Sequence, residues 1–314
     1  MRFAALHKQS YLAAMTTPAP DAAARSTRIG LMQATGAYLL WGLLPLYFMP
    51  LRGVDAGEVV ANRVVWSLAL LFAVVAVTRR GARLWLALTS VRTLRLLAAS
   101  AAMISVNWLV YIWAVQHHHV LEASLGYFLN PLVNVVLGVV VLREKLTRPQ
   151  LAAVILAGAG VLVLASQAAE GLWISLVLAL SFGLYGLIRK VAPVESVEGL
   201  TVETLLLTPV ALAYMAWLAA HGGLALTASD TLVTVLLLIA GIVTAIPLLL
   251  FAAGARRLPY SVIGLLQYLA PSIQFVLAIT LFGEVVTTAH LVCFALIWSG
   301  LAVFVVGSLR ARRV

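Results

Sequence analysis

The sequence predicts an all-α, polytopic membrane protein with ten transmembrane helices in two inverted five-helix repeats. Three observations support this fold class. Hydrophobic residues make up 63% of the chain and charged residues only 10%, whereas about a quarter of the residues in soluble proteins are charged. Ten apolar stretches have roughly the 20-residue length that spans a bilayer. Part of the first half also recurs in the second half, 140 residues later.

The first 28 residues lack a long apolar segment. Their longest apolar run, at residues 11–15, is too short for the apolar core of a signal peptide, which needs about 7–15 residues. We therefore expect residues 1–28 to be a disordered cytoplasmic tail. The first five-helix repeat is expected at residues 29–168 and the second at residues 169–314.

From Gly30 onward, apolar stretches alternate with short polar connections that leave no room for a soluble domain. Helices satisfy their backbone hydrogen bonds internally, so an all-helical bundle is expected in lipid. We predict transmembrane helices near residues 30–49, 58–78, 94–115, 121–142, 149–167, 171–188, 200–220, 231–254, 261–282 and 288–309.

The basic residues orient the bundle. If the N-terminus is cytoplasmic and the loops alternate, the cytoplasmic segments collect 19 of the 21 Lys and Arg residues. The outer loops hold Arg52, and Arg63 lies within the second span. This asymmetry predicts an inner (plasma) membrane protein with both termini in the cytoplasm. Basic residues dispersed between apolar runs also argue against a nucleic-acid partner.

The internal repeat indicates the function of the helical bundle. Pro131 matches Pro271, and Glu144 matches Glu284, at the same offset. Because each half contains an odd number of spans, the second half enters the membrane from the opposite side. Inverted repeats of this kind surround a midplane site in secondary transporters. The pattern therefore favours transport of a small-molecule solute across the lipid bilayer.

Two ionisable residues lie within predicted spans. Arg63 is about one and a half turns into the second span, and Glu203 occupies the equivalent position in the seventh. A charge inside the membrane is costly and indicates a functional site. The alternative is that both side chains reach nearby headgroups or fix neighbouring helices by local hydrogen bonds. Arg63 would bind an anion or a carboxylate, whereas Glu203 could also carry a proton.

Amide and aromatic side chains cluster in the third, fourth and ninth spans. Asn and Tyr residues there recur at helical i, i+4 spacing, and prolines at equivalent positions suggest interrupted helices around a cavity. Hydrogen bonds that only join packed helices are the alternative. With the two ionisable residues, the predicted substrate-binding set is Arg63, Asn107, Tyr111, Tyr127, Asn130, Asn134, Glu203, Gln267 and Tyr268.

Three consecutive histidines, residues 117–119, precede the fourth span. Neighbouring side chains on a helix point about 100° apart, and no Cys or carboxylate pattern completes a first shell, so we expect no metal site. A pH sensor and a hydrated hinge remain open. Glu122 either complements the helix dipole or couples transport to protons. The candidates for proton coupling are Glu122, Glu203 and His118.

The sequence contains no motif of an enzyme active site. It has no GxSxG elbow, HExxH pair or nucleotide-binding loop. We therefore expect no catalytic residue and no cofactor, and an ion gradient or the solute's own gradient as the driving force. Monomer and homodimer both remain open.

One stretch carries a family resemblance. The sequence NWLVYIWAVQHHHVLEASLGYFLNPLVNVVLGVVVLREKL, from Asn107, with AYLLWGLLPLYF before it and GIVTAIPLLLFAAGARRLPYSVIGLLQYLAPSIQFVLA after it, resembles RarD-type permeases of the EamA family, in the drug/metabolite transporter (DMT) superfamily. The resemblance runs from about residue 30 to 310. It implies ten spans in two inverted halves, a central cavity and efflux of a small organic solute or drug. Metabolite import, an intramembrane enzyme and a non-transporting assembly subunit are the alternatives.

Overall fold

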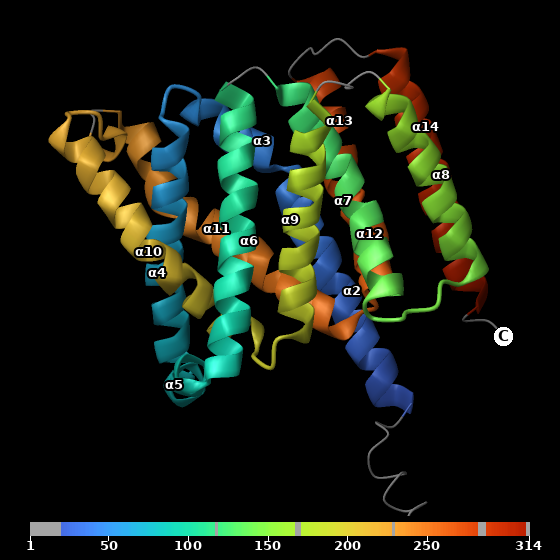
Figure 1. Ribbon diagram of the computed structural model, residues 1–314, viewed down its shortest axis with the longest axis horizontal. Coiled ribbons are helices and arrows are strands. Elements are labelled where there is room, and N and C mark those ends of the chain that lie inside the picture. Colours follow the sequence, from blue (N-terminus) through green and yellow to red (C-terminus); the bar gives the residue numbers. More distant parts are fainter. Residues whose placement is uncertain (1–19, 117–118, 167–170, 228–229, 282–286, 312–314) are drawn as a thin grey trace, which may run out of the picture.

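The computed structural model describes residues 20–116, 119–166, 171–227, 230–281 and 287–311. Within these ranges the chain is helical and contains no strand. Ten helices are long and apolar enough to cross a membrane, and each coincides with one of the ten predicted spans. The helices stand side by side with their ends at two opposite faces (Figure 1). The predicted all-α fold with ten spans is confirmed.

The first half contains five spans and three short elements. In chain order these are α2 (Pro20–Gly42), α3 (Leu44–Phe48), the 3-10 turn η1 (Met49–Leu51), α4 (Ala56–Val77), α5 (Gly81–Thr89), α6 (Val91–Gln116), α7 (Val120–Val140) and α8 (Arg148–Ala165). The second half follows as α9 (Leu172–Val191), α10 (Ser196–Ala220), η3 (Ala225–Thr227), α11 (Thr231–Arg257), α12 (Tyr260–Gln267), α13 (Leu269–Thr280) and α14 (Thr288–Ala311).

Helix α2 begins earlier than the sequence analysis placed it. It starts at Pro20, so residues 20–28 of the predicted tail are helical. Proline is favoured in the first turn of a helix because its missing N–H has no partner there anyway. The following Asp21 and the alanines at 22–24 continue the helix well. Residues 1–19 lie outside the described ranges.

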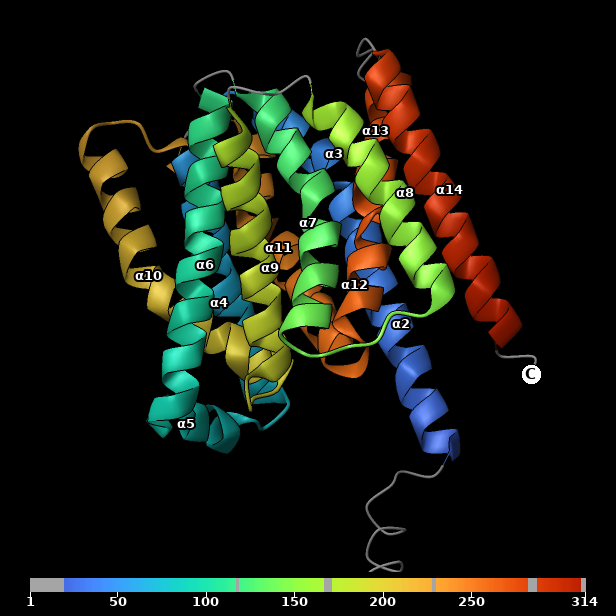
Figure 2. The same ribbon diagram turned by 45° about the vertical axis from the view of Figure 1, so that its right-hand side comes forward.

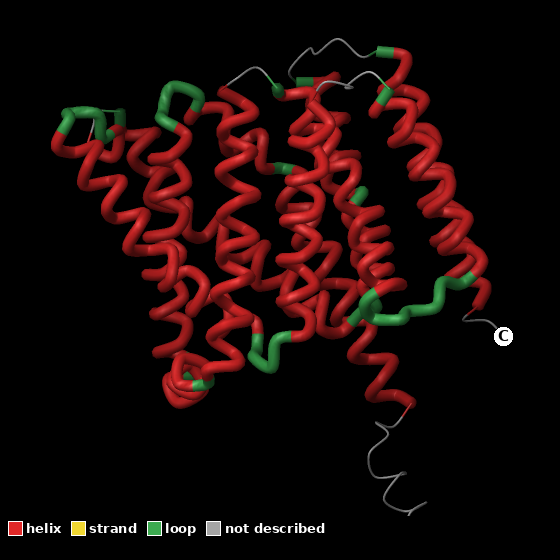
Figure 3. The backbone as a smooth tube through the Cα atoms, in the orientation of Figure 1, coloured by secondary structure: helices red, strands yellow, loops and turns green. Residues whose placement is uncertain are grey.

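Two spans are interrupted, but not in the predicted pattern. The ninth span breaks at Tyr268 between α12 and α13, as expected near Pro271. The fourth span, α7, instead continues through Pro131. The first span is interrupted between α2 and α3, where Pro45 enters the first turn of α3. Figure 3 shows both breaks as short non-helical stretches inside the bundle.

Eight spans form a closed ring. Going round it, each helix packs on the next in the order α2, α11, α4, α10, α6, α9, α7 and α12–α13, and the last returns to α2. Neighbours in this ring come alternately from the first and the second half of the chain. The remaining spans, α8 and α14, pack against each other at one edge of the molecule (Figures 1 and 2).

The α8–α14 pair shows how the halves are related. A β-carbon on Gly160 would lie 2.9 Å from the carbonyl oxygen of Cys293, and one on Gly300 would lie 2.9 Å from that of Ala153. These four positions form two equivalent pairs under the 140-residue offset. When exchanging two partners reproduces the same contacts, the partners are related by a twofold axis. As the residue number rises in one helix it falls in the other, so this local axis is perpendicular to the helices, as the predicted inverted repeat requires.

The outer surface of the bundle is apolar. Among the large hydrophobic residues that point outward are Val77, Leu162 and Val210, which are 83%, 71% and 72% exposed. In water such a surface would cause aggregation. In a bilayer it faces lipid tails of the same polarity, and small residues between the helices allow close packing.

The glycines of the α8–α14 contact give a test of this packing. Gly160→Ala and Gly300→Ala should each destabilise the protein by about 1–3 kcal/mol, because the added methyl group meets backbone that cannot move aside. Thermal unfolding of the purified protein in detergent measures the effect. Gly158→Ala, on the same helix α8 but facing open space, is the matched control and should not lower the melting temperature. Equal stability of all three variants would contradict the close contact.

Candidate functional site

A cavity of about 750 Å³ lies inside the ring. Its walls come from α2, α3, η1, α4, α6, α7, α9, α11, α12, α13 and α14. The cavity extends towards the end of the molecule that contains η1 and the loop between α2 and α4. Met49 and Arg52 line the cavity at that end. Aromatic rings cover much of its wall. They include Trp41, Phe48, Trp108, Phe182, Phe275 and Phe294.

Six of the nine predicted substrate-binding residues line this cavity, namely Arg63, Asn107, Tyr111, Tyr127, Asn130 and Gln267. They come from four different helices, so the fold gathers residues that are up to two hundred positions apart in the chain. Tyr111 and Tyr127 pack edge to face on the wall, with ring centroids 5.8 Å apart. Asn134, Glu203 and Tyr268 do not line the cavity.

Arg63 is held on three sides. Its Nε donates a hydrogen bond of 2.9 Å to Thr244 Oγ1. Its guanidinium carbon lies 5.6 Å from the ring centroid of Phe48 and 5.1 Å from that of Trp108. Such cation–π contacts stabilise a desolvated guanidinium. No carboxylate of a described residue lies within 4.0 Å of Arg63, so its charge is not neutralised by a described side chain.

The predicted amides divide into two kinds. Asn107 is satisfied within the bundle, because its Nδ2 donates to the carbonyl of Leu178 at 2.9 Å and to Ser181 Oγ at 3.1 Å. Asn130 is 1% exposed, and neither its Oδ1 nor its Nδ2 has a hydrogen-bond partner in the described part of the chain. A buried amide without partners is costly. Asn130 lines the cavity but both of its polar atoms lie beneath the wall, so a bound molecule can supply the missing partners only if the side chain or its neighbours move.

Asn134 and Tyr268 have the packing role that was the alternative interpretation. Asn134 Nδ2 donates to Gln267 Oε1 at 2.6 Å, which joins α7 to α12. Tyr268 is buried, and its hydroxyl donates to the carbonyl of Phe128 at 3.3 Å. Phe128 and Tyr268 are separated by 140 residues, so equivalent positions of the two halves meet at this point. Both residues lie behind the cavity wall.

Glu203 belongs to a buried ion pair. Its Oε1 accepts a 2.5 Å hydrogen bond from Ser100 Oγ and lies 3.7 Å from Nη1 of Arg189. The side chains of Arg189 and Glu203 are 1% and 3% exposed. Arg189 also donates to the carbonyl of Ser196 at 3.0 Å. A second, much smaller cavity of about 20 Å³ lies between Arg63 and Glu203 and is large enough for about one water molecule.

Aromatic residues close the floor of the large cavity. Tyr38 donates to the carbonyl of Ile263 at 3.2 Å, and Tyr260 donates to that of Gly183 at 2.7 Å. The rings of Tyr185 and Phe251 stack between them, with centroids 6.2 Å apart. All four of these aromatic residues are at most 1% exposed. This cluster separates the cavity from the opposite end of the molecule.

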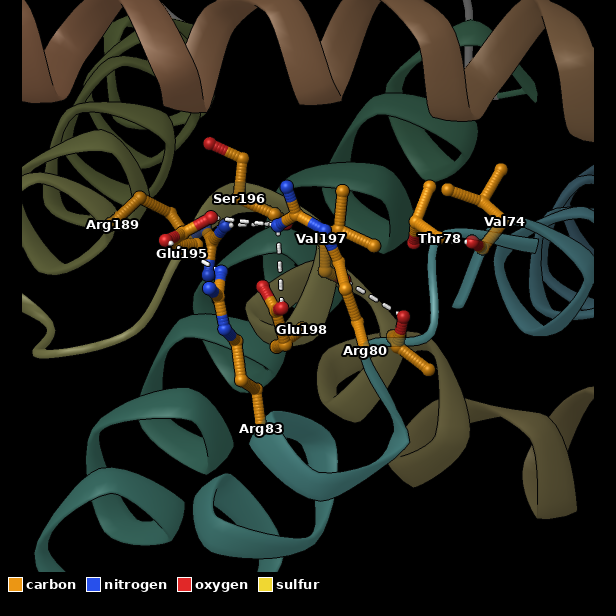
Figure 4. A network of polar contacts seen from close by, with 10 residues as sticks. Val74, Thr78, Arg80, Arg83, Arg189, Glu195, Ser196, Val197 and Glu198 are labelled. Carbon is orange, nitrogen blue, oxygen red and sulfur yellow. Dashed lines mark hydrogen bonds and ion pairs between the residues drawn. The ribbon is translucent and has the colours of Figure 1, made fainter. Parts of the chain in front are cut away.

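At that opposite end, ion pairs join α10 to the link between α4 and α6 (Figure 4). Arg80 Nη1 lies 2.6 Å from Glu195 and 3.3 Å from Glu198, and Arg83 Nη1 lies 3.1 Å from Glu195. The hydrogen bond from Arg80 lowers the pKa of the Glu195 carboxyl. The two ion pairs of Glu195 are therefore intact at neutral pH and weaken as the pH falls through that lowered pKa.

The equivalent acids of the first half make a matching contact at the other end. Asp55 and Glu58 precede Glu195 and Glu198 by 140 residues. Asp55 accepts from the Tyr214 hydroxyl at 2.7 Å. Glu58 is fully buried and accepts from the backbone N–H groups of residues 225 and 226 at 2.9 Å each. Helices α4 and α10 are thus joined at both ends.

Two further described acids, Glu122 and Glu144, do not line the cavity. Glu122 is on α7, and its carboxylate lies 3.6 Å from His119 Nδ1. His118 lies outside the described residues. Glu144, the repeat partner of Glu284, accepts from the backbone N–H groups of Tyr260 and Ser261 at the start of α12. No group of three or more metal-binding side chains occurs within the described ranges.

The sequence analysis missed several polar residues at this site. Thr244, the partner of Arg63, is one of three threonines in the apolar helix α11 and carries no recognisable pattern. Arg189 was counted only as a cytoplasmic charge, although it lies in the last turn of α9 and pairs with Glu203. His290 also lines the cavity, near the start of α14.

A helical membrane protein with a polar cavity enclosed by two related halves has the architecture of a solute transporter. Comparison with known proteins agrees. Residues 28–166 match the EamA-like transporter family. The chain is 43% identical to the protein RarD of Salmonella typhi over 92% of this chain and 99% of that one. It is 45% identical to an uncharacterized transporter of Pseudomonas aeruginosa, over 93% and 98% of the two chains.

The chain belongs to the EamA-like transporter family, as a RarD-type permease. A more distant relative in Pseudomonas aeruginosa, 35% identical over 90% of this chain and 95% of its own, is called chloramphenicol-sensitive protein RarD. A solved crystal structure with 21% identity covers 93% of this chain and 99% of its own at a TM-score of 0.67, and shows the same fold.

The Arg189–Glu203 pair gives a second test. Glu203→Ala should lower the melting temperature in detergent by about 10 °C, because removing one partner of a buried pair leaves the other charge uncompensated, at a cost of about 3–5 kcal/mol. The double variant Arg189→Met/Glu203→Met should recover most of that loss. Glu195→Gln, at the 52% exposed side chain that pairs with Arg80, is the control and should cost less than about 1 kcal/mol. Additive losses in the double variant would contradict the pairing.

Proposed function

We propose that the protein is a secondary transporter of the inner membrane that moves a small organic solute outward by alternating access. The observation that carries this proposal is the cavity of about 750 Å³ inside the helical ring. Ligand cavities of 300–1,000 Å³ enclose solutes of this class. The solute would contact Arg63 and Asn130, with Tyr111, Tyr127 and Gln267 on the surrounding wall.

The distribution of charge supports an outward-facing conformation. The link containing α5, the α7–α8 connection and the α9–α10 turn lie at one end of the bundle (Figure 1), and these segments carry much of the positive charge. By the positive-inside rule that end is cytoplasmic. The cavity extends to the other end, and the aromatic floor with the Arg189–Glu203 pair closes it towards the cytoplasm. An inward-facing state would require that closure to open.

Glu203 is the group we propose for coupling to protons. It is a carboxylate in a buried ion pair, next to the small cavity that also contacts Arg63. Protonation of Glu203 would neutralise the carboxylate and weaken its ion pair with Arg189. Of the other two candidates, Glu122 lines neither cavity, and His118 lies outside the described residues.

Transport itself is tested in two steps. Cells that overproduce the protein should accumulate a solute in the medium relative to cells without it, and the purified protein in liposomes should then show counterflow of that solute. Arg63→Ala and Asn130→Ala should each abolish counterflow, because they remove the polar groups that the cavity leaves without partners. Gly158→Ala is the control for reconstitution. Normal counterflow by both cavity variants would refute the site, and accumulation inside the cells would indicate import instead.

The orientation is tested by thiol labelling in intact cells. After the native Cys293 is replaced by alanine, Ser124→Cys places a thiol on the cavity wall, and Arg83→Cys places one at the basic end. A membrane-impermeant maleimide should modify position 124 in intact cells but position 83 only after the cells are opened. The reverse pattern would show that the cavity faces the cytoplasm.

A further inference from the structure

We infer that the solute taken by the cavity is an organic monoanion whose carboxylate pairs with Arg63. This inference rests on the proposed transport site and specifies its substrate class. It depends on the balance of charge inside the cavity, on the direction in which the Arg63 guanidinium is free to bind, and on a second polar group that has no partner.

The charge balance favours an anion. Among the described residues that line the large cavity, Arg52 and Arg63 are basic, His290 is titratable, and none is Asp or Glu. The carboxylates elsewhere in the bundle interior already have partners. Glu58 is bound to backbone N–H groups, Glu144 caps α12, and Glu203 pairs with Arg189. A cation in a region of low dielectric requires a negatively charged partner. Because no described residue of the cavity wall is a carboxylate, the solute would have to be that partner.

The geometry of Arg63 leaves one edge for a ligand. Its Nε is bound to Thr244, and Phe48 and Trp108 pack on the guanidinium. Its Nη1 and Nη2 groups have no hydrogen-bond partner among the described residues and are not fully buried, and Arg63 lines the cavity. Two parallel N–H donors are the arrangement that binds a carboxylate in a bidentate manner. A guanidinium fixed in this way loses little freedom when the anion binds.

The rest of the cavity requires more than a small inorganic ion. Its volume is about 750 Å³ and its walls are largely apolar, with aromatic rings among the apolar side chains, which suits an apolar body several carbon atoms long. The amide oxygen and amide nitrogen of Asn130 lie without partners just beneath this wall, so a hydroxyl, amino or carbonyl group on that body would be favoured once the Asn130 side chain turns towards the cavity. Acetate or chloride would satisfy Arg63 but would leave both of these features unused.

Binding to the purified protein in detergent tests the inference without requiring transport. Three probes of nearly equal shape differ in charge: 3-phenylpropionate, 3-phenylpropanamide and 3-phenylpropylamine. Quenching of tryptophan fluorescence should report the tightest binding for the carboxylate, with the amide weaker by about 10-fold or more and the protonated amine weaker still. Acetate, which has the charge without the apolar body, should compete poorly.

Arg63 variants connect this selectivity to one side chain. Arg63→Gln should abolish the preference for the carboxylate over the amide, and Arg63→Lys should retain part of it because the charge remains without the planar fork. Arg92→Gln, the same loss of charge at an exposed position of α6, should leave the preference unchanged. Size-exclusion chromatography verifies that each variant is folded.

The outcomes separate the inference from the proposed function. Equal binding of carboxylate and amide by the wild type, binding of none of the three probes, acetate binding as strongly as 3-phenylpropionate, or an unchanged preference in Arg63→Gln would each overturn the inference. Selective carboxylate binding without counterflow of any solute in liposomes would uphold the anion site and refute transport. Counterflow of a neutral or cationic solute that requires Asn130 would uphold transport and refute the anion.

Discussion

The cost of placing charge in a low-dielectric interior is the constraint on which the inside of this bundle depends. Nearly every buried charged group among the described residues has a partner: Glu203 has Arg189 and Ser100, Glu58 has two backbone N–H groups, and Glu144 has the first turn of α12. Arg63 differs because aromatic faces and one hydroxyl are its only described contacts. The charge of Arg63 is therefore left without a carboxylate partner among the described residues at the place where the cavity lies.

The 140-residue repeat of the sequence places these groups at equivalent positions without making them identical. The same two helix starts carry Asp55 with Glu58 in one half and Glu195 with Glu198 in the other. One pair binds a tyrosine hydroxyl and backbone N–H groups, whereas the other binds arginine side chains. Arg63 and Glu203 likewise occupy equivalent positions with opposite charge. A shared scaffold thus produces a cavity at one end and an ion-paired closure at the other.

The sequence was sufficient for the fold because span length, apolar composition and the 140-residue repeat are properties of the chain itself. It also identified most of the polar residues of the cavity wall, because an amide or an arginine in an apolar span usually marks either a packing contact or a functional site. It could not separate Asn130, which has no partner, from Asn134, which bonds to Gln267, because that difference depends on which helix lies opposite. The continuous path of α7 through Pro131 likewise depends on tertiary packing that no local pattern encodes.

The alternation of the two halves around the ring has a mechanical consequence. Any line that divides the ring into two arcs leaves helices of both repeats on each side, so neither repeat can swing as a rigid block. Motion must instead come from bending at the interruptions, such as those beside Leu43 and Tyr268. The same interleaving affects biogenesis. The first five spans have their neighbours in the second half, so they must remain in the bilayer as loosely associated helices until synthesis of the last spans completes the ring.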